Sequence, residues 1–383
     1  MSNIINTRSP FYIQAIPTSG LIGGAYLNLT VWAGEKVADK PASPQYIIQK
    51  DKVLAFNLIN FEISELIRDF LKTEYYGVPQ SIDGVWVEVE LSLYDAAGTP
   101  TETQIFEYLS FDGFGYFPEG SNPRTSTDPL TVPTGNYTPM VLQSNTTVYF
   151  QNDNFIVIPI FSESQAVVTT TISGIWDLAD YYWQDADFNW EATSLPQQIT
   201  DSDNSLDKIQ YLIIDSSNAQ TGDTITVTST AGNSQVVVIT LEQISCGIYE
   251  DYQVIFYNKF GALQDFYMNK KSKQSLKVKN ETYKNNIINY YEADYNKFLH
   301  QTRVYDVQGN QEVSLNSEFL KPEFNEVIKQ LFLSEQVWLK VNNRTFPALL
   351  NERAFNEKTS VNDKLIQYGL TFNIASDTIN NIR

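Results

Sequence analysis

The chain has 383 residues, more than a single hydrophobic core usually supports, so two or three domains are expected. Hydrophobic residues make up 42% of it and aromatic residues 13%, mostly 23 Tyr and 22 Phe, which favour pleated sheet surfaces over helices. The formal net charge of −19 is concentrated in residues 1–250, which carry 9 basic and 30 acidic side chains, so this part repels nucleic acid and excludes it as a partner.

Residues 1–161 are expected to form an N-terminal β domain with one helix. Every second residue of 85–93 is Val or Leu, which predicts a regular strand with 101–109 as its return partner. Apolar residues at helical spacing predict an amphipathic helix over 61–71, and the loss of periodicity over 110–140 predicts a long loop. Shorter alternating segments predict further strands at 21–32, 46–48, 53–58, 147–150 and 155–160.

Residues 162–245 are expected to form a small β module, a candidate insertion, and 246–383 a C-terminal β domain with one helix. That helix is expected to have Pro322 in its first turn. The predicted fold class is mainly β, with multi-domain antiparallel β-sandwich or barrel-like units and a few short α-helices. Strands are expected at 166–172, 211–214, 224–229, 235–241, 252–257, 262–268, 303–305, 311–315, 337–341, 345–350 and 365–374.

Three copies of one turn pattern occur between these predicted strands. Each has Tyr, then Asp or Asn, then two residues and Gly, at 94–98, 257–261 and 305–309. Asp or Asn accepts hydrogen bonds from the backbone of its own turn, and Gly tolerates a positive φ, so each copy predicts a type I turn that closes a hairpin. These residues are expected to determine the shape of the backbone and to have no catalytic or binding role.

No combination of side chains predicts an active site, and the protein is expected not to be an enzyme. The single histidine, His300, has no Ser or Asp at a recognised spacing, so a hydrogen-bonded structural role is expected. Four acids lie among aromatic residues in a way that superficially resembles a sugar-binding cleft: Asp177, Asp180, Asp185 and Asp187. A glycan-degrading enzyme would require an activity that is lost when Asp185 or Asp187 is changed to Asn.

No metal or cofactor is expected. The segment 201–207 imitates the start of a calcium loop, but Leu206 occupies the position of the required glycine and Leu212 that of the required glutamate. Cys246 is the one cysteine, so neither an intramolecular disulfide nor a metal-ligand spacing is available. It is expected to be a small core residue.

Two groups of aromatic residues are candidate binding residues. The first group lies in a glycine-rich stretch, where the side chains either anchor a neighbouring subunit or fill a local core beneath the loop. The second group lies among acids and also suits stacking on sugar rings, as in a carbohydrate-binding module. The candidates are Phe111, Phe114, Tyr116 and Phe117 in the first group, and Tyr181, Tyr182, Trp183 and Trp190 in the second.

The N-terminus lacks a basic stretch followed by an apolar run, and no window has 18 consecutive apolar residues. Neither a signal peptide nor a membrane span is therefore expected, and the protein is expected to be made in a cytoplasm. The lysines of 270–284 either form a solvated face or meet an acidic neighbour, such as the N-terminal region of another subunit.

Three segments carry a resemblance to a known group of proteins. They are the hairpin 252–266 with Lys271 and Ser272 after it, the early segment 25–71, and 357–368 near the end, together about a third of the chain. Here the chain resembles structural proteins of tailed bacteriophages that infect Bacteroidota. The resemblance implies a role in the virion, in the tail or baseplate, and transfers no site residues.

The expected function is therefore a structural component of a tailed-phage virion, a tail or baseplate ring or hub protein that assembles through β-rich interfaces. Its expected partners are copies of itself and other virion proteins. Candidate contacts between subunits are the loop 110–140 and the terminal segment 375–383, because loops and sheet edges extend onto neighbours in such rings. The alternatives are a receptor-binding or adhesin protein that recognises host glycans, and a capsid-decoration or head-fibre protein.

Overall fold

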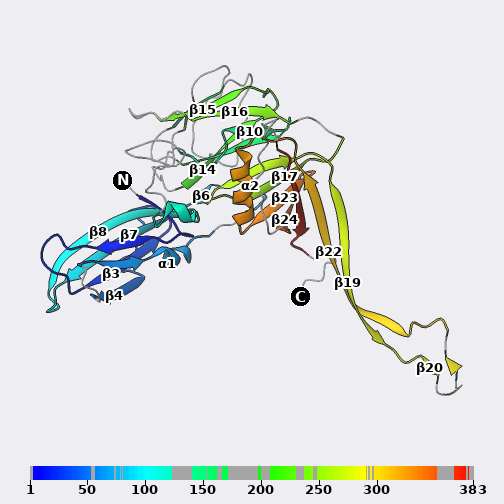
Figure 1. Cartoon of the computed structure of the whole chain (residues 1–383), viewed down its shortest axis with the longest axis horizontal. Coiled ribbons are helices and arrows are strands. Elements are labelled where there is room, and N and C mark those ends of the chain that lie inside the picture. Colours follow the sequence, from blue (N-terminus) through cyan, green and yellow to red (C-terminus); the bar gives the residue numbers. More distant parts are fainter. Residues whose placement is uncertain are drawn as a thin grey trace. The chain divides into compact units, whose positions relative to one another are not determined.

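The computed structural model shows a mainly β protein, as the composition predicts, with two short α-helices among the described residues (Figure 1). The chain divides into two compact units. The first unit is Met1–Ile244, Phe256–Phe266 and Glu326–Ser334, and the second is Ser245–Ile255, Tyr267–Asn325 and Glu335–Arg383. The residues described are 3–52, 57–72, 75–77, 79, 81–122, 140–152, 154–161, 166–170, 197–199, 208–229, 237–244, 248–289, 291, 294–295, 297–351, 366–376 and 378.

Five strands of the first unit form one sheet in the order β1-β8-β7-β3-β4. β1 runs parallel to β8, and the other neighbouring pairs are antiparallel. The alternation predicted for 85–93 is confirmed, because Val89, Leu91 and Leu93 are fully buried and face one core. The strands are β1 Asn3–Asn6, β3 Gly24–Trp32, β4 Tyr46–Asp51, β7 Val85–Tyr94 and β8 Pro100–Phe111.

The helix predicted over 61–71 is shorter than expected. Its first residues belong to strand β5, Ile59–Glu62, which pairs with β2, Tyr12–Ala15, and only Ser64–Arg68 forms helix α1. Ile59, Phe61 and Ile63 alternate and are all buried, so a period of two fits the start of this segment better than the helical period. The pairing with β2 supplies hydrogen-bond partners for the backbone of β5, which a helix would otherwise supply within itself.

Two further sheets of the first unit form a β-sandwich. Buried side chains from both sheets share one core, for example Ile158 and Ile214 from one sheet and Ile239 from the other. Strands from both sides of residue 162 contribute to it, and a separate module over 162–245 stays a prediction. The orders are β10-β16-β15-β12-β13 and β6-β14-β11-β9, with β6 Ile82–Asp83, β9 Met140–Val141, β10 Thr147–Phe150, β11 Phe155–Phe161, β12 Ala166–Thr170, β13 Gln197–Ile199, β14 Lys208–Asp215, β15 Thr224–Ser229 and β16 Val237–Gln243.

The C-terminal strands form a seven-stranded sheet in the order β18-β17-β23-β24-β25-β22-β19. Helix α2, Phe324–Leu333, lies between β22 and β23 in the sequence and begins two residues after Pro322. The remaining two strands, β20 and β21, form a separate short pair. The bounds are β17 Tyr252–Tyr257, β18 Leu263–Met268, β19 Lys273–Lys284, β20 Ile288–Asn289, β21 Asp294–Tyr295, β22 Thr302–Asn316, β23 Val337–Val341, β24 Arg344–Leu350 and β25 Gly369–Ile374.

This seven-stranded sheet is strongly curled. Five strand spacings separate β17 from β19, about 24 Å in a flat sheet. Nevertheless Gln274 on β19 donates a hydrogen bond to the hydroxyl of Tyr252 on β17, with 2.8 Å between the two atoms. The sheet therefore bends into an open barrel whose inner face meets itself across the interior.

The first predicted turn is confirmed and joins β7 to β8. Oδ1 of Asp95 accepts hydrogen bonds from the backbone N–H groups of Ala97 at 2.8 Å and Thr99 at 2.9 Å. Gly98 has a φ of +79°, which only glycine adopts without strain. The side chain and the glycine act as the sequence predicts.

The second predicted turn is also confirmed and joins β17 to β18. Oδ1 of Asn258 accepts hydrogen bonds from the N–H groups of Phe260 at 3.0 Å and Ala262 at 3.2 Å, and Gly261 has a φ of +77°. In contrast to Asp95 in the first turn, Asn258 is completely buried. The same local geometry thus occurs at the surface and in the interior.

The third predicted turn, over 305–309, is wrong. These residues lie inside β22, and Gly309 pairs with Val278 of β19 in the middle of a long antiparallel pair. The register shifts where Glu281 pairs with Asp306 and the next residue of β19 pairs with Val304, so Tyr305 is an extra residue in a β-bulge. Continuous pairing with β19 keeps the segment extended, and the chain reverses only beyond the last pair of this hairpin.

The hairpin of β23 and β24 has a two-residue turn made of Asn342 and Asn343, whose φ values are +48° and +58°. Two residues with positive φ match a type I′ turn, for which Asn and Gly are the favoured residues. Replacing Asn343 by Val is expected to lower the free energy of unfolding by about 1–2 kcal/mol, because a β-branched residue is strained at this φ. Urea unfolding measures the loss, and Asn343→Gly is the control that should retain full stability.

Candidate assembly surface

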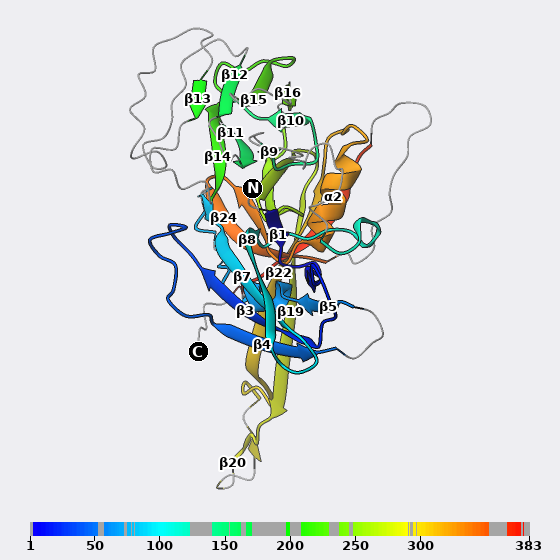
Figure 2. The same ribbon diagram turned by 90° about the vertical axis from the view of Figure 1, so that its left-hand side faces the viewer.

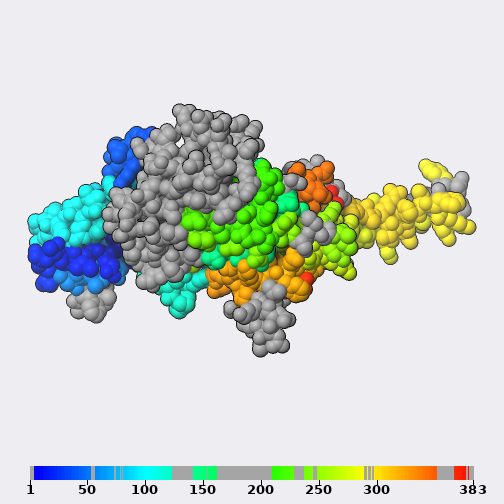
Figure 3. Space-filling model, turned by 90° about the horizontal axis from the view of Figure 1, so that it is seen from above, coloured from blue at the N-terminus to red at the C-terminus, as the bar shows by residue number. Residues whose placement is uncertain are grey.

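A long hairpin extends beyond the rest of the curled sheet in the second unit (Figures 1 and 2). We call it the arm; it comprises β19, β22 and residues 285–301 between them. Twelve residues of β19 pair with β22, from Lys273 with Ser314 to Lys284 with Thr302. In Figure 3 the arm is a narrow projection of atoms, and residues on both of its faces, such as Leu276 and Lys279, are exposed.

One face of the arm is apolar and exposed. Leu276 and Val278 are each 57% exposed and lie on the same face as Val307 and Gly309, because residues paired directly across an antiparallel ladder share a face. An added Cβ at Gly309 would lie 3.3 Å from Cβ of Thr378 and 3.4 Å from Cδ1 of Leu276, so both side chains cover the glycine. Exposed apolar faces of this kind mark interaction surfaces.

The opposite face of the arm is charged and polar. It presents Lys277, Lys279 and Glu281, and the carboxylate of Glu281 accepts a hydrogen bond from the hydroxyl of Tyr305. This hydrogen bond, together with desolvation, raises the pKa of Tyr305. The two faces therefore differ in chemistry, which gives the arm a defined orientation toward any partner.

The outer end of the arm exposes further large apolar side chains. Tyr291 is 100% exposed and Phe298 is 94% exposed, and Ile288, Tyr295 and Leu299 are also exposed. Burying one such side chain in an interface stabilises it by about 1.5–3 kcal/mol, so several of them together suffice to anchor a partner.

The arm also lies at an edge of its sheet, since β19 is the last strand in the order. Residues 270–284 contain six Lys and one Glu. Lysine on an edge strand discourages uncontrolled strand pairing, and it also attracts an acidic partner. Lys270 and Lys277 form ion pairs with Glu318 and Glu312, and the other four lysines beside an apolar face favour a partner that is acidic with apolar patches.

The first group of predicted aromatic residues has divided roles. Phe111 is the last residue of β8 and is buried, with its ring centroid 5.5 Å from that of Phe161 in an edge-to-face contact. It fills a local core, one of the two expected roles. Phe117 is 100% exposed and is available to a partner.

Phe114 and Tyr116 lie between these extremes and are half-buried. The guanidinium of Arg8 lies 5.3 Å from the ring of Phe114, and Nζ of Lys329 lies 3.8 Å from the ring of Tyr116. The hydroxyl of Tyr116 donates a 2.6 Å hydrogen bond to Glu326. Burial is the main cause that raises the pKa of Tyr116, and this hydrogen bond raises it further. Both rings are thus held by contacts within the first unit.

The remaining predicted residues are placed as follows. His300 is exposed on the arm, and its expected hydrogen-bonded structural role stays a prediction. Sequence reasoning missed the arm, although the alternation of Leu276 and Val278 with lysines was a signal for a two-faced strand. Outside the described residues lie Tyr181, Tyr182, Trp183, Trp190, Asp185, Asp187, Cys246, 201–207, 123–139 and 379–383.

Comparisons with known protein families and with curated proteins give no match for this chain. No helix within the described ranges is long and apolar enough to span a membrane. The arm and the surfaces beside it are therefore the features of the molecule that bear on its function.

Proposed function

We propose that the protein is a structural component of a tailed-phage virion, a tail or baseplate ring or hub protein that assembles through β-rich interfaces. The observation that carries the proposal is the arm, whose outer end and one face expose apolar side chains. An enzyme needs convergent polar groups in a pocket, whereas an assembly protein needs extended surfaces that become buried on association.

The dimensions of the arm suit contact with a neighbouring subunit. Its 12-residue strand β19 spans about 40 Å at the usual rise per residue. A hairpin of this length reaches across a neighbour rather than filling a gap in its own core. Residues 1–250 of another copy, with 9 basic and 30 acidic side chains, supply the acidic surface that the basic edge of the arm favours.

Removing the end of the arm is expected to abolish self-assembly while the rest of the chain stays folded. The variant replaces residues 285–301 by Asn-Gly, which closes Lys284 onto Thr302 in a two-residue turn. Light scattering at low and physiological salt measures the mass in solution. The full-length protein should give a multiple of the 43.6 kDa chain mass, and the variant should give one chain mass.

A second variant and a matched control sharpen this test. Leu276→Ser with Val278→Ser removes the apolar face of the arm without shortening it, and the assembly should weaken at least tenfold. Leu21→Ser with Val37→Ser removes two exposed apolar side chains from the first unit and should leave the assembly unchanged. A monomeric full-length protein under every condition, or arm variants that assemble normally, would contradict the proposal.

A further inference from the structure

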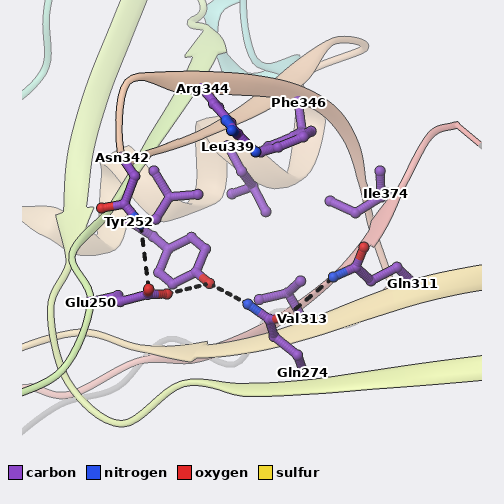
Figure 4. A pocket seen from close by; sticks show the side chains of 11 residues that line it. Glu250, Tyr252, Gln274, Gln311, Val313, Leu339, Asn342, Arg344, Phe346 and Ile374 are labelled. Carbon is purple, nitrogen blue, oxygen red and sulfur yellow. Dashed lines mark hydrogen bonds between the residues drawn. The ribbon is translucent and has the colours of Figure 1, made fainter. Parts of the chain in front are cut away.

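The open barrel encloses a pocket of about 460 Å³ at the base of the arm. Six of the seven strands contribute residues to it, including Gln274 of β19 and Gln311 of β22. Its volume lies within the range of about 300–1,000 Å³ that is usual for small-ligand sites. Figure 4 shows the side chains that point toward this space.

One wall of the pocket is apolar. Val313 and Leu339 are buried, and Phe346 lies directly opposite Leu339 in the pairing of β23 with β24. Ile374, at the end of β25, continues this wall. These residues face the interior of the barrel, so the wall has the apolar composition of a hydrophobic core and borders an unfilled space.

The opposite wall is a chain of hydrogen bonds (Figure 4). Glu250 accepts from Nδ2 of Asn342 at 3.3 Å and from the hydroxyl of Tyr252 at 3.4 Å. The Tyr252 hydroxyl in turn accepts from Gln274 at 2.8 Å, and Gln311 donates to Gln274 at 3.4 Å. The carboxylate of Glu250 is therefore already bound within the protein.

Arg344 is the charged group of the pocket that the described residues leave without an ion pair or hydrogen bond. It is exposed and follows the Asn342–Asn343 turn, which places it at the mouth beside Phe346. In Figure 4 it lies on the other side of the space from Glu250. A guanidinium presents donors in a planar fork that matches a carboxylate in a bidentate pair.

We propose that this pocket binds a carboxylate attached to an apolar body, with the carboxylate on Arg344 and the body against Leu339 and Phe346. Gln274 and Gln311 lie on the same face of the arm as Leu276, but Arg344, Leu339 and Phe346 belong to β23 and β24, so the proposed binding does not depend on the proposed function. An aromatic or branched body of the size of an amino-acid side chain fits the stated volume.

The test uses the full-length protein and 3-phenylpropanoate as a probe, with 3-phenylpropanamide as its neutral counterpart. Isothermal titration should show that the acid binds about tenfold more tightly than the amide. Arg344→Gln should remove this preference and leave binding of the amide unchanged. Lys340→Gln is the matched control, because Lys340 lies on the opposite face of the same hairpin, and it should retain the preference. Equal affinities for acid and amide, or an unchanged preference in Arg344→Gln, would overturn the proposal.

A second pair of probes distinguishes two sources of the carboxylate. The peptide acetyl-Gly-Gly-Phe with a free C-terminus is compared with its C-terminal amide. Tighter binding of the free peptide than of 3-phenylpropanoate supports the C-terminus of a partner protein as the ligand. Binding of 3-phenylpropanoate alone supports a small carboxylic acid. Binding of neither rules out a carboxylate site.

Discussion

Replacing Asn258 by alanine is expected to lower the free energy of unfolding by at least about 3 kcal/mol, because the side chain is fully buried and makes four hydrogen bonds. Its Oδ1 accepts from the N–H groups of Phe260 and Ala262, and its Nδ2 donates to the carbonyl of Leu142 at 2.6 Å and to Gln264 at 3.1 Å. Each buried group left without a partner costs about 1–3 kcal/mol. Urea unfolding followed by fluorescence measures the loss.

Asp95→Ala is the matched control for this substitution. Asp95 makes the same two turn hydrogen bonds, but water can replace them at the surface, so a loss of about 0.5–1.5 kcal/mol is expected. Asn258→Asp keeps the acceptors of the turn and loses the donors to Leu142 and Gln264, which separates the turn from the buried contacts. Equal losses for Asn258→Ala and Asp95→Ala would show that burial does not determine the effect.

Gly261→Ala is the second substitution with a large expected effect. The glycine has a φ of +77°, and an added Cβ would lie 2.9 Å from the backbone C and 3.0 Å from the backbone O of Asp112. Asp112 is held in place by Arg8, which forms an ion pair with its carboxylate at 3.3 Å and donates to its carbonyl at 3.4 Å. Backbone strain and overpacking together should lower the free energy of unfolding by about 3 kcal/mol or more.

Gly98→Ala isolates the strain from the overpacking. Gly98 has nearly the same φ, +79°, and nothing lies within 4 Å of an added Cβ, so only the cost of the positive φ, about 1–2 kcal/mol, is expected. Both variants are compared by urea unfolding under the same conditions. If the two losses agree, the segment around Asp112 moves away from the new methyl group and the overpacking argument is wrong.

Sequence periodicity predicted the parts of the fold in which burial follows one simple pattern. The alternation over 85–93 gave β7, and the Asp95 and Asn258 turns lie where the sequence predicted them. Local pattern was misleading where pairing with a distant strand decides the conformation. The residues of 305–309 match the other two turns, yet their pairing with β19 keeps them in an extended strand.

The candidate site was less accessible to sequence reasoning. Exposure of Tyr291 or Phe298 is a property of the tertiary structure, because the same residues in a sequence equally suit a core. The pocket depends on six strands brought together by the curl of one sheet, and Gln274 and Arg344 lie far apart in the chain. Nor does the sequence distinguish Asp95 from Asn258, whose surroundings make one a surface residue and the other a buried one.

The bulge at Tyr305 determines which way the outer part of the arm faces. Val304 and Val307 are three positions apart, so in a regular strand they would point to opposite faces. Because Tyr305 is unpaired, Val304 pairs with Thr282 and shares the face of Leu276, Val278 and Val307. If Tyr305 instead paired with Thr282, Val304 would turn to the opposite face and the apolar stripe would be split between the two sides. The one unpaired residue of β22 therefore keeps the apolar side chains of the arm together on a single surface that it offers to a partner.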